Sequence, residues 1–163
     1  MSIRIKPRNK NIPPIPFFIK LFGTGFYSGF FPFASGTFAS LVALIVFLFP
    51  SFHVWYNLLV LILIFYWIGV YTAEKIERLV GQDPSIVVID EFVGMWLSLI
   101  FLPISVITIV LAFILFRVFD ILKPFPANYF NNKSGGNAIM LDDVIAGIYA
   151  NLVLQLFVLF VEI

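Results

Sequence analysis

Two long uncharged runs constrain this chain more than any other feature. Residues 54–73 and 144–161 hold 20 and 18 residues without a charged side chain, and about 20 apolar residues cross the hydrocarbon of a bilayer as one helix. Over the whole chain 61% of residues are hydrophobic and 12% are charged, which is roughly half the charged fraction of a soluble domain. The sequence therefore predicts an all-α fold, a polytopic integral membrane helical bundle.

Further apolar segments raise the predicted number of transmembrane helices to four or five. Residues 86–102 and 104–122 are separated by Pro103 and predict a helical hairpin. Residues 38–49 are too short to cross alone, and irregular backbone at membrane depth needs protein or a wet cavity to satisfy it. We expect a broken or re-entrant N-terminal hydrophobic segment, because turn-forming residues punctuate the stretch before it: Gly23, Gly25, Gly29, Pro32 and Gly36.

The positions of lysine and arginine orient these predicted spans. With a basic N-terminal arm, residues 1–14, on the inside, five crossings place all ten basic residues on one side of the membrane. Such an excess is typical of cytoplasmic loops. We expect a single membrane-embedded domain over residues 1–163, whose polar loops 74–85 and 123–143 face the cytoplasm.

Five acidic residues lie where charge is costly in a membrane protein. An ionised carboxylate at the centre of a bilayer helix costs on the order of 3 kcal/mol. At ~1.5 Å rise per residue, Asp90 lies about 6 Å from the start of its segment and Asp120 about 3 Å from the end of its own. Asp142 and Asp143 stand just before the last predicted span. We therefore expect these acids, together with Glu91, to meet at the cytoplasmic interface rather than at the bilayer centre, where ion pathways usually lie.

The charges of this cluster indicate a divalent cation and a phosphate. Arg117, Asp120 and Lys123 follow one another at i, i+3 and i+6 on one helix face. Five carboxylates against two cationic side chains leave a formal charge of −3, which would repel a phosphate dianion. Mg²⁺ binds carboxylate oxygens together with substrate phosphate and can activate a water molecule. Arg117 and Lys123 would then hold phosphate oxygens.

Structural interpretations of the same residues stay open. Asp142 or Asp143 could be the N-cap of the last helix. Arg117 and Asp120 could form a structural ion pair, and Lys123 could be a lysine that extends its ammonium to the interface.

Other polar residues are less suggestive of chemistry. The charged group at residues 74–78 is typical of a solvated helix end, and Asn151 and Gln155 share a face that would tie helices together. His53 is the one histidine and lies on the far side from the acids. The absence of cysteine excludes a thiol nucleophile, and a lone histidine does not support a histidine-dependent phosphatase.

Several short motifs lie along the chain from about Leu21 to Ala150. They are Gly23-Thr24-Gly25, Ser35-Gly36-Thr37 with Ser40, Asp90-Glu91 with Gly94, Arg117 with Asp120 and Lys123-Pro124, Gly135-Gly136, and Asp142-Asp143 with Ala146-Gly147. Together these motifs resemble the phosphatidylglycerophosphatase A family, although Ser35 is a departure, since many relatives have proline at this position. The resemblance implies a Mg²⁺-dependent enzyme of the bacterial cytoplasmic (inner) membrane, which hydrolyses the terminal phosphate monoester of phosphatidylglycerophosphate to give phosphatidylglycerol.

The resemblance and the residues predict the same site. The expected Mg²⁺ ligands or water-orienting carboxylates are Asp90, Glu91, Asp142 and Asp143, with Asp120 as a further ligand or as the partner of Arg117. The expected phosphate-binding residues are Arg117 and Lys123, with hydroxyl contacts from Thr24, Thr37 and Ser40. We expect direct attack by water, lipid partners and no nucleic acid, and the sequence leaves the oligomeric state open. The alternative is a membrane transporter or channel with an acidic ion-binding site.

Overall fold

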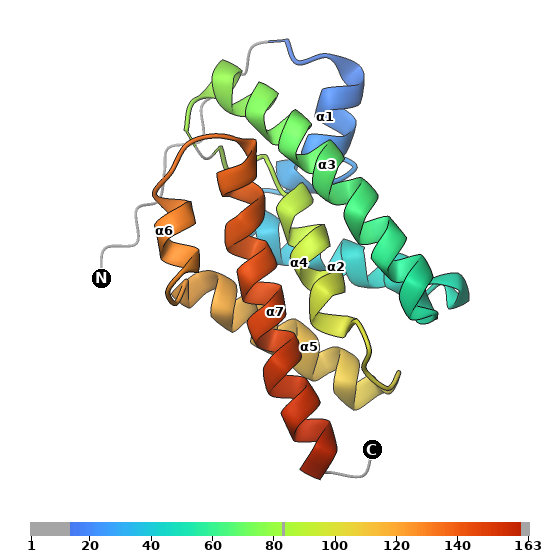
Figure 1. Ribbon diagram of the computed structural model, residues 1–163. Coiled ribbons are helices and arrows are strands. Elements are labelled where there is room, and N and C mark those ends of the chain that lie inside the picture. Colours follow the sequence, from blue (N-terminus) through green and yellow to red (C-terminus); the bar gives the residue numbers. More distant parts are fainter. Residues whose placement is uncertain (1–13, 83, 161–163) are drawn as a thin grey trace.

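The computed structural model describes residues 14–82 and 84–160, and in these ranges every regular element is helical (Figure 1). The all-α prediction is therefore confirmed. Most of the predicted basic arm, residues 1–13, lies outside the described residues. Large apolar side chains are exposed along several helices, among them Ile45, Trp67 and Leu159, as expected for a surface that faces lipid.

Two helices are long and apolar enough to cross a membrane. Helix α3 (Trp55–Val80) has 26 residues and α7 (Gly136–Phe160) has 25, which corresponds to about 39 and 37 Å at the usual helical rise. Each covers all but one terminal residue of one uncharged run and extends beyond it into polar sequence. The remaining predicted spans are shorter helices, α2 (Ser35–Phe47), α4 (Ile89–Leu99) and α5 (Val106–Leu122), so the total of four to five crossings stays a prediction.

Helix α4 is the centre of the bundle. Nine of its 11 residues are buried, and it packs against α2, α3, α5 and α7 (Figure 1). The indole of Trp96 donates a hydrogen bond to the Ala43 carbonyl of α2 at 2.9 Å. At the end of α4, Asn151 of α7 donates to the carbonyls of Ser98 and Ile100 at 3.3 and 2.8 Å. The predicted helix-tying role of Asn151 is confirmed.

Two glycines bring the backbones of α4 and α7 into contact. A Cβ atom on Gly147 would lie 2.4 Å from the Gly94 carbonyl oxygen, and one on Gly94 would lie 2.7 Å from the Asp143 carbonyl oxygen. Any side chain at either position would force the helices apart. Because Asp90 and Asp143 each precede one of these glycines by one helical turn, the crossing holds both carboxylates at the same level.

The N-terminal apolar segment is broken, as its glycines predict. Helix α1 (Phe17–Gly23) is followed by the 3-10 turn η1 (Ser28–Phe30) before α2 begins. Between them Gly25, Phe26 and Tyr27 all have positive φ angles of 52°, 55° and 69°, so the chain reverses within a few residues. The reversal brings the start of α2 beside the start of α4, where the Ser35 hydroxyl donates to the Ser85 carbonyl at 2.9 Å.

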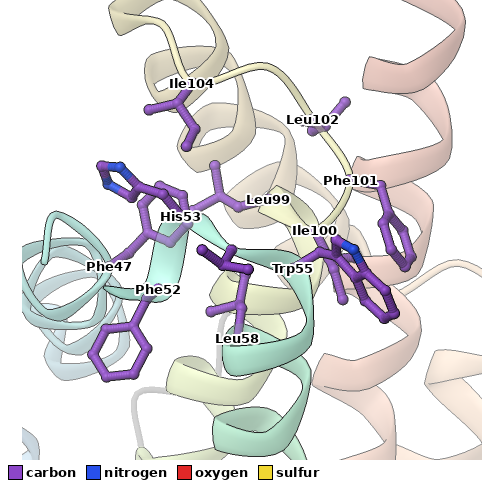
Figure 2. A pocket seen from close by; sticks show the side chains of 11 residues that line it. Phe47, Phe52, His53, Trp55, Leu58, Leu99, Ile100, Phe101, Leu102 and Ile104 are labelled. Atoms are coloured by element: carbon purple, nitrogen blue, oxygen red, sulfur yellow. The ribbon is translucent and has the colours of Figure 1, made fainter. Parts of the chain in front are cut away.

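The far end of α4 borders an apolar pocket. Its volume is about 300 Å³, and Figure 2 shows His53 among apolar and aromatic side chains there. His53 belongs to the turn η2 (Pro50–His53), and its ring centroid lies 5.4 Å from that of Phe47. Leu99 and Ile100 line the same pocket, at the opposite end of α4 from Asp90. The prediction that His53 lies away from the acids is confirmed.

Candidate metal and phosphate site

The five predicted acids meet at one end of the bundle. Asp90 and Glu91 occupy the first turn of α4, Asp120 lies near the end of α5, and Asp142 and Asp143 lie in α7. Their carboxylate oxygens form two groups, in each of which all ligand atoms lie within 4.8 Å of one another. The groups are Asp90, Asp142 and Asp143, and Glu91, Asp120 and Asp143. The predicted convergence of three distant segments is therefore confirmed.

The two aspartates of α7 are not helix caps. Helix α7 begins at Gly136, so Asp142 and Asp143 follow six and seven residues later, inside the helix. The N-cap interpretation is wrong for both residues, because the helix begins before the uncharged run that they precede. Both side chains are buried, with 6% and 2% of their residues' surface exposed. A carboxylate buried inside a helix is costly unless it is paired or binds a metal.

Arg117 joins α5 to the acids of α4. Its guanidinium forms an ion pair with Glu91, and Nη1 lies 3.1 Å from Oδ2 of Asp120. The Ser40 hydroxyl of α2 donates to Oε2 of Glu91 at 3.2 Å and lies 3.5 Å from Nη1 of Arg117. The pair predicted at i, i+3 is thus present, but Arg117 also bridges two helices. Among residues 14–82 and 84–160, no group forms a hydrogen bond with its buried Nε atom.

Lys123 ends α5 and turns its ammonium toward the acids. It has a left-handed backbone with φ of 45°, which is costly for a residue with a side chain. Its ammonium pairs with Asp142 and lies 3.8 Å from Oδ1 of Asp120. Burial lowers the pKa of Lys123, but the carboxylates of Asp142, Asp143 and Asp120 outweigh that effect and raise the pKa above its ordinary value. The ammonium is therefore charged at neutral pH.

A close contact between α2 and α4 fixes the carboxylate of Glu91. A Cβ atom on Gly36 would lie 1.9 Å from Oε1 of Glu91 and 3.3 Å from Nη1 of Arg117. Position 36 therefore tolerates no side chain while Glu91 keeps its place. This contact explains why a glycine stands in the first turn of α2, where it contributes little to helix stability.

The three predicted hydroxyl residues have different surroundings. Ser40 is buried and contacts Glu91 within the cluster. Thr24 is also buried, but its hydroxyl donates to the Lys20 carbonyl at 2.7 Å and accepts from the Tyr27 amide at 3.3 Å, which makes it part of the turn after α1. Thr37 lies in the first turn of α2, next to Gly36. Phosphate contacts by these residues stay predictions.

Glu77 is a residue that sequence reasoning missed. Within the group at residues 74–78, Glu74 and Arg78 form the expected exposed i, i+4 pair, but Glu77 is buried at 9% exposure. Its carboxylate accepts a hydrogen bond of 2.6 Å from the Gly135 amide, just before α7. The signal was the helical period, because position 77 follows the buried Ala73 by four residues on the same face of α3.

The acid cluster has oxygens that the protein itself does not satisfy. In the described part of the chain, Oδ1 of Asp90 and Oδ2 of Asp143 are buried without a hydrogen-bond partner. Buried carboxylate oxygens are costly unless they are paired or bind a metal. The donor set consists of carboxylates, which suits a hard divalent cation such as Mg²⁺. The residues present therefore fit the metal that the sequence predicted.

Fold and site together define a helical protein with two membrane-length helices and a buried cluster of carboxylates, arginine and lysine. Comparison with known families gives the more specific assignment. Residues 21–158 match the family model of phosphatidylglycerophosphatase A, and the chain belongs to this family. The resemblance noted in the sequence is thereby confirmed.

Two curated relatives carry the name of this family, and a third relative of similar identity carries another name. The chain is 43% identical over 140 residues to phosphatidylglycerophosphatase A of Haemophilus influenzae, covering 83% of this chain and 85% of the relative. It is 37% identical over 131 residues to the Escherichia coli protein of the same name, covering 78% and 76%. It is 42% identical over 138 residues to a Bacteroides thetaiotaomicron protein named "Putative phosphatidylinositol-3-phosphatase", covering 80% and 87%. No solved structure matches the chain.

Proposed function

We propose that this protein is a Mg²⁺-dependent phosphatidylglycerophosphate phosphatase that works at the cytoplasmic face of a bacterial inner membrane. The observation that carries the proposal is a pair of buried carboxylate oxygens on Asp90 and Asp143, for which the described ranges offer no hydrogen-bond partner. Both lie in one cluster with Arg117 and Lys123. Family membership supports the lipid phosphate as substrate. The transporter alternative has no such support.

The proposed orientation follows from the ends of the helices. We infer four to five crossings, with the N-terminal end of α4 and the C-terminal end of α5 at the cytoplasmic interface. Lys75, Arg78 and Lys133 would then lie on the cytoplasmic side with the acid cluster, as the excess of positive charge in cytoplasmic loops favours. An anionic headgroup at this interface reaches the cluster without entering the hydrocarbon.

Each charged side chain has a role in the proposed hydrolysis. Mg²⁺ would be held by Asp90, Glu91, Asp142 and Asp143 and would supply charge neutralisation and an activated water. Arg117 and Lys123 bind the phosphate oxygens, and the unpartnered Nε of Arg117 is a donor that the protein leaves unused. A carboxylate orients the attacking water and accepts its proton. The water oxygen bonds to phosphorus as the phosphorus–ester oxygen bond breaks, and the ester oxygen takes up the proton from that carboxylate and leaves as the hydroxyl of phosphatidylglycerol.

A phosphate-release assay tests this proposal. The purified protein in detergent is given phosphatidylglycerophosphate with and without Mg²⁺, and inorganic phosphate is measured. We expect Asp90→Asn and Asp143→Asn each to lower release at least about 100-fold, at unchanged expression and helicity, since even the residues that only orient metal ligands cost about 10- to 100-fold when they are replaced. The matched control is Glu74→Gln, which changes an exposed acid of α3 and should leave release unchanged. Full activity in both aspartate variants would refute the site.

The substrate headgroup needs its own comparison. The relative from Bacteroides thetaiotaomicron is named for a phosphatidylinositol phosphate, so this lipid is a second candidate substrate. The assay should therefore be run in parallel with phosphatidylinositol 3-phosphate. A higher kcat/KM on the inositol lipid would keep the phosphatase chemistry and change the proposed substrate.

A further inference from the structure

The five acids of the site form two ligand groups with one shared member. One group contains Asp90, Asp142 and Asp143, and the other contains Glu91, Asp120 and Asp143. Asp143 is the shared residue; it is 2% exposed, and its buried Oδ2 atom has no hydrogen-bond partner among the residues that the structure describes. A carboxylate has two oxygens and can bind a different cation through each of them. The arrangement therefore offers more than one cation position.

We propose that the site holds two divalent cations bridged by Asp143, one on the Asp90–Asp142 side and one on the Glu91–Asp120 side. This inference rests on the proposed phosphatase function and goes beyond it in the number of cations and in the assignment of ligands. Paired cations are a known arrangement for displacement at phosphorus, because they stabilise both the attacking and the leaving oxygen.

The charge of the cluster favours two cations over one. Five carboxylates with Arg117 and Lys123 give a formal charge of −3. One divalent cation leaves the site negative, so a phosphate dianion would still be repelled. A second divalent cation makes the formal charge positive, and only then does the site attract the headgroup of the substrate. Solvent and salt screen these charges little, because the side chains are buried. Exposure is below 9% for Glu91, Asp120, Asp142 and Asp143.

The ion pairs of Arg117 use one oxygen of each carboxylate on the second side. Arg117 contacts Oε2 of Glu91 and Oδ2 of Asp120, which leaves the other oxygen of each carboxylate. Oε1 of Glu91 packs closely against Gly36, which holds this oxygen in place without a charged partner from Arg117. Oδ1 of Asp120 lies 3.8 Å from the Lys123 ammonium, beyond hydrogen-bond distance. Glu91 and Asp120 can therefore bind a cation while they keep Arg117 in place.

Mn²⁺ is the probe for counting the cations, because it replaces Mg²⁺ and is paramagnetic. The full-length protein in detergent is equilibrated with Mn²⁺, the bound metal per chain is measured, and electron paramagnetic resonance spectra are recorded at low temperature. We expect two Mn²⁺ per chain and the broadened spectrum of an exchange-coupled pair. Asp120→Asn should lower the count to one and restore the resolved hyperfine pattern of isolated Mn²⁺. Asp143→Asn should weaken both positions, by about tenfold or more.

Control variants separate metal loss from misfolding. Glu91→Gln should give the same count as Asp120→Asn, and it provides a second test if either variant loses its folded size-exclusion profile. Glu74→Gln, an exposed acid of α3, should still bind two Mn²⁺. One Mn²⁺ per chain at saturation, with a hyperfine pattern that Glu91→Gln and Asp120→Asn leave unchanged, would overturn the pair.

The two proposals fail in different ways. One bound Mn²⁺ together with Mg²⁺-dependent phosphate release would overturn the cation pair and keep the function. Two bound Mn²⁺ without phosphate release from either lipid would keep the pair and overturn the function.

Discussion

Replacing Gly36 with alanine tests whether the position of the Glu91 carboxylate decides activity. The new Cβ atom would lie 1.9 Å from Oε1 of Glu91, whereas real Cβ atoms essentially never approach another atom within 3.0 Å. The carboxylate must therefore move by about 1.1 Å or more, since a close-packed interior has no spare room. A displacement of about 1 Å in a catalytic site lowers a rate about 100-fold. We expect kcat of Gly36→Ala to fall by about this factor, roughly 2.7 kcal/mol in activation free energy.

The same substitution should change stability much less than activity. Overpacking costs about 1–3 kcal/mol, and alanine gains up to about 1 kcal/mol over glycine within a helix. The assay is phosphate release under saturating lipid, with the melting temperature of the detergent-solubilised protein measured in parallel. Gly23→Ala is the matched control, because its Cβ would meet the side chains of Ile76 and Thr72 on α3, a helix that contributes none of the five acids. It should retain kcat.

A second substitution distinguishes a displaced carboxylate from general damage. Glu91→Asp shortens the side chain by one methylene and should relieve the clash with an alanine at position 36. We expect the double variant to lose less activity than the two single variants predict together, which is a favourable coupling in a double-mutant cycle. Wild-type kcat in Gly36→Ala, or simple additivity in the cycle, would refute the reasoning.

Two further predictions concern contacts that support the site. Asn151→Leu removes both donors to the carbonyls of Ser98 and Ile100 and should lower the free energy of unfolding by about 1–3 kcal/mol; an unchanged denaturation midpoint would contradict the role of this side chain. Glu77→Leu leaves the Gly135 amide without its acceptor and should cost about 1.5–3 kcal/mol, measured as faster amide hydrogen exchange at the start of α7. Equal exchange rates in the variant and the wild type would argue against that anchor.

The positions of Asp90 and Asp120 near the ends of their helices could be predicted from the sequence, because the helical rise per residue converts residue number into distance along the helix. Both lie close to the ends of apolar segments, so their meeting at one level followed from the membrane alone. The start of α7 could not be predicted in this way. Residues 136–143 mix glycine, polar and apolar side chains, and the helix there depends on packing against α3, where a Cβ on Gly136 would lie 1.9 Å from the Val70 carbonyl oxygen.

The partners of Arg117 and Lys123 could also be predicted only in part from the sequence. Periodicity within one helix gives Asp120 as the neighbour of Arg117 at i, i+3, and this pair is present. The pairs of Arg117 with Glu91 and of Lys123 with Asp142 join different helices. They depend on how α4, α5 and α7 cross, which is fixed by contacts such as that of Gly94 with Gly147 and not by any local pattern.

The neighbouring helices shield α4 from the surrounding lipid or detergent. Since nine of its 11 residues are buried, annular lipid or detergent molecules meet α4 hardly at all, and the spacing between Asp90 and Asp143 is set by backbone contact between two helices. Bilayer thickness and headgroup composition would act on the outer helices, and so on how a substrate arrives. Turnover at saturation should then vary little from one micelle or nanodisc to another, while the apparent KM changes with the surroundings.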